Sequence, residues 1–387
     1  MMESIETSDT TLEEQSAPGL TSRDSLSATS STTTSTAPFA DSPEAQPGAS
    51  EAESESENPQ PDDEFWFEDG NLILIAGDVE FRIYKGPLIA NSPVFKDMLS
   101  LPSPGPPPDQ TVATPAATGG SQCSCGKNPA LVHVQDSPED MRHFLQALVP
   151  GKTPRVAPDN DSFHTVSACI RLGHKYEVDY MVERSLAYLK QYFVCAPDAW
   201  DRTSFPKPPT FEDVHCIGVV NLARLTDTAI LLPPALMTCC RLSATELMNG
   251  FAREDGTREV LSQEDIGRCF VGRARLVEAK AFVTLKVFDQ ALSPDCTRSS
   301  ECEPIFLRLL DHLKSNKDVL CNVFWHNLLG SYIEREDRDR NLCWPCFKLL
   351  KAREKEEQQK VWRKMPELLD LTVEDWAEEC CKEGSDD

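Results

Sequence analysis

Apolar residues between positions 72 and 83 follow the pattern of two short β-strands. The first run, 72–75, is continuously apolar, and the pair Gly77-Asp78 supplies the residues that a tight turn needs. In the second run every other residue is apolar, so these side chains share one face: Val79, Phe81 and Ile83. We therefore expect a β-hairpin that buries one of its faces.

Two short amphipathic helices are predicted after this hairpin. Ser92-Pro93 is typical of a helix start, because serine caps free backbone N–H groups and proline fits the first turn. The apolar residues on both sides of this start recur at helical spacings. They are Leu88, Ile89, Val94, Phe95, Met98 and Leu99.

A third strand and three more helices are predicted before residue 193. The strand covers 130–134, and a helix capped by Ser137 follows it. Two packed helices are expected from the apolar residues of 163–170 and 176–189. This part of the chain therefore combines a small sheet with helices.

The order of these elements, together with SPVF at 92–95, resembles the BTB/POZ family of protein-interaction domains. KYEV at 175–178 is similar to the family's link between its last two helices. The resemblance implies an α+β domain, residues 64–193, in which helices flank a short three-stranded sheet.

The resemblance also implies how this domain would act. Family members usually dimerise or dock partners through the face that their first short helices form. On this chain the corresponding candidate partner-binding residues are Leu88, Val94, Phe95, Met98 and Leu99. The sequence leaves open which of the five contact a partner and which belong to the core.

Two features depart from the family pattern. Tyr84-Lys85 stands where many members carry His-Arg or His-Lys at the end of the second strand. Residues 102–128 form an insertion rich in proline and glycine, which we expect to be a disordered loop. In members that recruit cullin ligases, part of the binding surface lies in this region, so the insertion argues against cullin binding.

A second region follows a proline-rich linker at 194–210. We expect residues 211–372 to be mainly α-helical, and the arrangement is similar to fungal BTB proteins with a helical C-terminal extension. An acidic tail is predicted at 373–387. Helical stripes begin at residue 211, and further helical candidates cover 266–290, 304–314, 319–333 and 345–364.

The net charge of −25 is concentrated near the start of the chain. Fifteen acidic residues and one basic residue, Arg23, precede Phe65. Residues 1–63 are also rich in Ser, Thr and Pro, so they lack the apolar area needed to offset the entropy of ordering. We predict a disordered acidic tail there.

Charge and hydropathy also restrict the partners. Lys and Arg cluster in 351–364, but glutamates alternate with them, so we expect no nucleic-acid binding. No run of eighteen apolar residues and no secretory signal is found, so we expect no membrane span. The predicted location is cytoplasmic or nuclear.

The fifteen cysteines are expected to be reduced, and most of them to be small buried apolar residues. Cys343 and Cys346 form a CxxC pair, which can present two thiolates to one metal. Cys296 with Cys302, or the terminal Cys380-Cys381, would complete a four-sulfur zinc site. Because a strong zinc signature has two CxxC pairs, we favour a buried pair at a helix start and predict no metal or cofactor.

The sequence contains no motif for a catalytic serine elbow, a zinc protease, a phosphate-binding loop or a dinucleotide fold. We therefore predict a non-enzymatic scaffold for protein–protein interaction, a possible homodimer. Two alternatives stay open. One is a substrate adaptor of a cullin-RING ubiquitin ligase, and the other is a transcriptional regulator that acts through corepressor binding.

Overall fold

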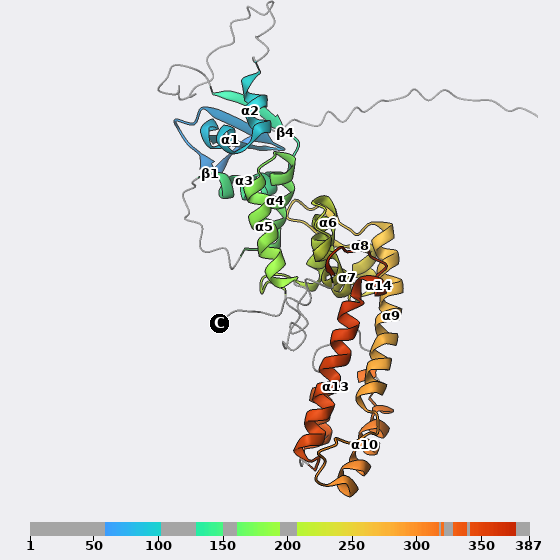
Figure 1. Ribbon diagram of the computed structural model, residues 1–387. Coiled ribbons are helices and arrows are strands. Elements are labelled where there is room, and N and C mark those ends of the chain that lie inside the picture. Colours follow the sequence, from blue (N-terminus) through green and yellow to red (C-terminus); the bar gives the residue numbers. More distant parts are fainter. Residues whose placement is uncertain are drawn as a thin grey trace, which may run out of the picture. The chain divides into compact units, whose positions relative to one another are not determined.

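The protein is α+β, with a small mixed sheet and mostly helices (Figure 1). A computed structural model describes residues 59–101, 129–149, 161–193, 207–316, 319–320, 328–338 and 341–376. All of these residues belong to one compact unit. The insertion predicted at 102–128 and most of the predicted tails and linker lie outside the described residues.

The main sheet has the strand order β1-β3-β2-β4. The predicted hairpin is formed by β2 and β3, which pair antiparallel with Leu74 opposite Phe81. The other two strands run parallel to their neighbours, β4 beside β2 and β1 beside β3. The four strands are β1 (Gln60–Trp66), β2 (Leu72–Ala76), β3 (Val79–Ile83) and β4 (Ala130–Val134).

Strand β1 corrects two of the sequence predictions. The sheet has four strands where three were expected, and ordered structure begins before residue 64. Hydrophobic patterning missed this strand because acidic residues occupy its centre. Its Asp62 is buried, accepts hydrogen bonds from the backbone N–H groups of Glu64 and Phe65, and pairs with Arg142 at 2.8 Å. A carboxylate with these partners is compatible with a buried strand.

Serine caps begin three of the helices that pack around this sheet. The side chains of Ser92, Ser137 and Ser162 each accept a hydrogen bond from the backbone N–H three residues later, as the sequence predicted for the first two. The helices are α1 (Lys85–Asn91), α2 (Pro93–Ser100), α3 (Pro138–Leu148), α4 (Phe163–Lys175) and α5 (Asp179–Tyr192).

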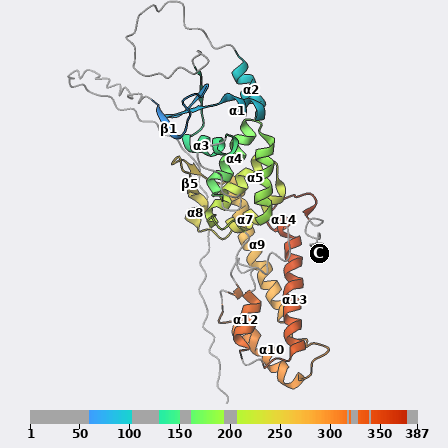
Figure 2. The ribbon, with the colours of Figure 1, turned by 90° about the vertical axis from the view of Figure 1, so that its left-hand side faces the viewer.

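Helices α9 and α13 lie side by side in opposite directions (Figures 1 and 2). Arg353 of α13 donates to the carbonyls of Val287 and Asp289 at the end of α9, and Arg275 of α9 donates to the carbonyl of Glu367. The helices of this region are α6 (Cys216–Leu225), α7 (Leu232–Cys239), α8 (Ala244–Asn249), α9 (Gln263–Val287), α10 (Ser299–Leu313), α12 (Leu328–Glu336), α13 (Trp344–Arg363) and α14 (Met365–Leu368).

Two details of this region differ from the sequence predictions. Helix α10 begins at Ser299, so Pro304 lies inside the helix and does not start it. A small hairpin, β5 (Phe251–Ala252) with β6 (Arg258–Glu259), interrupts the region that was expected to be mainly helical and for which no strand was predicted. Its turn holds Gly256 at a φ of 76°, a conformation that favours glycine.

Buried apolar side chains form two clusters, and helix α4 belongs to both. Phe163, Val166 and Ile170 join the cluster that extends through the C-terminal helices. Cys169 and Leu172 join the cluster between the sheet and its helices. Helix α5 also contributes to both, with Leu189 in the first cluster and Met181 in the second. The sheet region and the helical region therefore share these two helices.

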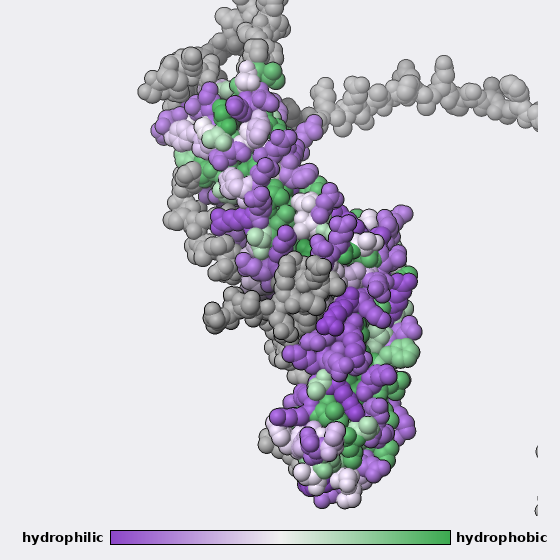
Figure 3. All heavy atoms as spheres, viewed as in Figure 1, coloured by the Kyte–Doolittle hydropathy of each residue, from purple (hydrophilic) through white to green (hydrophobic). Residues whose placement is uncertain are grey.

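The face shown in Figure 3 is mostly hydrophilic, with apolar side chains in small areas between polar ones. The exposed apolar residues include Phe282 and Leu285 of α9. Such scattered residues are normal on a protein surface. Among the helices of the described residues, none combines the length and the apolar content that crossing a bilayer requires.

A pair of glycine substitutions tests the packing of α4 against α6. A Cβ atom at Gly218 would lie 2.1 Å from Cζ of Phe163, whereas a Cβ atom at Gly267 of α9 meets nothing within 4 Å. We expect Gly218→Ala to lower the free energy of unfolding by about 1–3 kcal/mol through overpacking. Gly267→Ala should leave it unchanged or raise it by up to about 1 kcal/mol. Urea denaturation measures both, and a Gly218→Ala protein as stable as the parent would contradict this packing.

Candidate functional site

The five candidate partner-binding residues divide into two groups. Leu88 of α1 and Phe95 of α2 are fully buried, so they belong to the core of the sheet region. Val94, Met98 and Leu99 of α2 are half-buried at its edge. Only the second group is placed where a partner could touch it.

Phe95 anchors α2 through an aromatic stack. Its ring centroid lies 4.4 Å from that of Tyr176 and 6.3 Å from that of Phe144. The hydroxyl of Tyr176 donates to Asp136, and burial, followed by this hydrogen bond, raises the pKa of Tyr176. The phenol therefore stays protonated and holds the stack in place.

Ser92 connects the start of α2 to the end of α4. Its hydroxyl accepts from the backbone N–H of Phe95 at 3.0 Å and donates to the carbonyl of Tyr176 at 2.6 Å. The side chain is buried, so both hydrogen bonds are shielded from water. Helix α2 is thus fixed at its first turn by a cap that also bonds a distant residue.

The accessible side of α2 carries an apolar stripe. Val94 and Met98 are four residues apart, and Leu101 follows three residues later at the C-cap. Leu101 is 72% exposed, and the neighbouring Lys96 and Asp97 are exposed polar residues. Sequence reasoning missed Leu101, although its spacing continues the helical pattern of Val94 and Met98. This stripe is the surface of α1 and α2 best suited to a partner.

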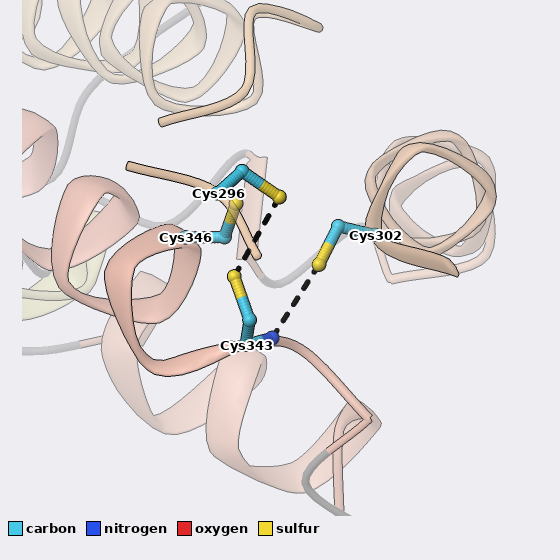
Figure 4. A group of neighbouring side chains, drawn as sticks. All are labelled: Cys296, Cys302, Cys343 and Cys346. Carbon is cyan, nitrogen blue, oxygen red and sulfur yellow. Dashed lines mark hydrogen bonds between the residues drawn. The ribbon is translucent and has the colours of Figure 1, made fainter. Parts of the chain in front are cut away.

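A second candidate site is a group of four cysteines (Figure 4). Cys296 lies in the loop after α9, and Cys302 lies in the first turn of α10. Cys343 is the N-cap of α13, and Cys346 lies in that helix's first turn. All four Sγ atoms lie within 4.8 Å of one another. Figure 2 shows α10 and α12 at the end of the α9–α13 pair where α13 begins.

Burial and hydrogen bonds change the pKa values of three of the four thiols in different directions. Burial raises the pKa of Cys302 and raises that of Cys346 to about 12. Burial also acts to raise the pKa of Cys343, but backbone hydrogen bonds from Cys346 and Thr297 outweigh it and lower this pKa to about 6. The backbone N–H of Cys343 itself donates to Sγ of Cys302 at 3.4 Å. The cluster thus offers backbone donors to negatively charged sulfur.

The structure extends the prediction made for the CxxC pair. Cys343 and Cys346 do start a helix, but Cys296 and Cys302 join them, which the favoured interpretation did not include. The alternative pair Cys380-Cys381 lies outside the described residues. The cysteines predicted to be small buried residues are buried where the structure describes them: Cys169, Cys216, Cys239, Cys240 and Cys269.

Comparisons with protein-family models, with curated proteins and with solved structures find no match to this chain. The function is therefore inferred from the fold and from the geometry of these two sites.

Two substitutions on α2 test whether Phe95 belongs to the core. Phe95→Ala removes a fully buried ring and should lower the free energy of unfolding by about 3–5 kcal/mol. Lys96→Ala, on the exposed side of the same helix, should change it by less than about 0.5 kcal/mol. Thermal unfolding followed by circular dichroism measures both variants. If Phe95→Ala melts like the parent, Phe95 is not a core anchor.

Proposed function

We propose that this chain is a non-enzymatic protein-interaction module of the BTB type, which self-associates or docks a protein partner through α1 and α2. The observation that carries the proposal is the apolar stripe of Val94, Met98 and Leu101 on a helix fixed at its first turn. The order of the elements supports it: a hairpin, two short helices, a strand parallel to the hairpin's first strand, and further helices.

The geometry of α2 suits this role for an energetic reason. Binding costs free energy when side chains and backbone must be ordered at the interface. Phe95 and Ser92 already hold α2 against the aromatic stack, so the helix would bind without reordering. Lys96 and Asp97 beside the stripe would form the polar rim that surrounds most apolar interface centres.

The sequence also left two alternatives, a cullin-ligase adaptor and a regulator that binds corepressors. The insertion that would bear on cullin binding, 102–128, lies outside the described residues. No contact of the described residues favours either alternative over the general role of an interaction module.

Light scattering coupled to gel filtration tests self-association through the stripe. We expect the full chain to elute with twice its mass of 43.1 kDa. Met98→Glu places a charge in the middle of the stripe and should shift the protein to the monomer mass, because an interface centre tolerates unpaired charge poorly. Lys286→Glu, an exposed change on α9 away from α2, is the control and should remain dimeric.

A monomeric parent would exclude self-association and leave docking of another protein. A photo-crosslinking residue at position 98 of the full chain, expressed in cells, then tests whether another protein docks at the stripe. Crosslinks from position 98, and none from the exposed position 267, would support docking at the stripe. No crosslink from position 98 would overturn the proposal.

A further inference from the structure

The four-cysteine cluster has the dimensions of a metal site. A tetrahedral zinc ion with Zn–S bonds of about 2.3 Å needs its sulfur atoms roughly 3.8 Å apart. Sγ of Cys343 lies 3.7 Å from Sγ of Cys296, and no pair in the cluster exceeds 4.8 Å. We propose that Cys296, Cys302, Cys343 and Cys346 bind one Zn²⁺ ion as a closed structural site. This site is independent of the α2 stripe and of any partner that docks there.

The number and arrangement of the thiols favour a metal over a disulfide. A disulfide joins two sulfur atoms at about 2.0 Å, and two cysteines would be enough for it. Here four thiols from three separate segments meet at one point, with their sulfur atoms turned toward one another (Figure 4). Four sulfur ligands around one centre are the donor set of structural zinc.

The chain also provides groups that would balance the charge of bound thiolates. Four thiolates and one Zn²⁺ together carry a charge of about −2, which needs hydrogen-bond donors when it is buried. The first turns of α10 and α13 bring Cys302 and Cys346 to helix N-termini, where the helix dipole favours negative charge. The N–H of Cys343 already donates to Cys302.

The position of the cluster indicates what the metal would do. The cysteines come from the loop after α9 and from the starts of α10 and α13, so one ion would fasten these three segments together. All four coordination positions would be taken by protein sulfur, and three of the cysteines are buried. A site without an open position is structural and not catalytic.

Metal analysis of the full chain tests the proposal. Protein purified without chelators should contain one zinc ion per chain by native mass spectrometry and by elemental analysis. Cys296→Ser and Cys343→Ser should each lose the zinc. Cys216→Ser is the matched control, because Cys216 is a buried cysteine outside the cluster and a hydroxyl can replace its hydrogen bond to Thr238. This control should keep one zinc ion.

A spectroscopic measurement on the parent chain covers the case in which the serine variants fail to fold. Replacing zinc with Co²⁺ should give the intense visible absorption of tetrahedral cobalt with thiolate ligands. Zinc retained by Cys343→Ser, iron in place of zinc, or a parent mass equal to protein alone would each overturn the proposal. A cobalt spectrum typical of oxygen ligands would also overturn it, since it would place the metal outside the four thiols.

Discussion

Helix α4 has to satisfy two hydrophobic cores at once, and the rest of the structure depends on this constraint. Phe163, Val166 and Ile170 pack into the cluster of the C-terminal helices, whereas Cys169 and Leu172 pack into the cluster under the sheet. Burial of apolar side chains stabilises each core, so removing α4 would expose apolar surface in both. The two regions that the sequence separates by a linker are therefore coupled through α4, and also through α5, whose Leu189 and Met181 lie in different clusters.

Polar contacts strengthen this coupling at the β5–β6 hairpin. Asp140 of α3 is buried and accepts two hydrogen bonds from Arg171 of α4, at 2.5 and 2.8 Å. Arg253 of the hairpin also donates to Asp140, and the adjacent Glu254 lies 2.7 Å from Nε2 of His143. Loss of one arginine would leave Asp140 paired with the other, whereas loss of Asp140 would take this counter-charge from both half-buried guanidinium groups.

Local features of the fold could be predicted from the sequence, and features made by distant residues could not. The cap at Ser92 follows from short-range rules, and so does the hairpin turn at Gly77-Asp78. Strand β1 was missed because Asp62 is stabilised by Arg142, which is eighty residues away. Likewise, the sequence spacing favoured a simple CxxC pair. Cys302 is about forty residues away from this pair along the chain and comes close to it only in the folded protein. The apolar residues of α2 were found, but patterning could not separate the buried Phe95 from the accessible Met98.

Hydrogen exchange measured by mass spectrometry on a Phe163→Ala variant tests the sharing of α4 most directly. Phe163 belongs to the cluster of the C-terminal helices, and the exposed Phe282→Ala serves as the control. If α4 couples the cores, slow amides should lose protection in β2 and β3 as well as in α6 and α7, because both cores open together. Loss of protection confined to α6 and α7 would show that the two cores unfold independently and would contradict the account.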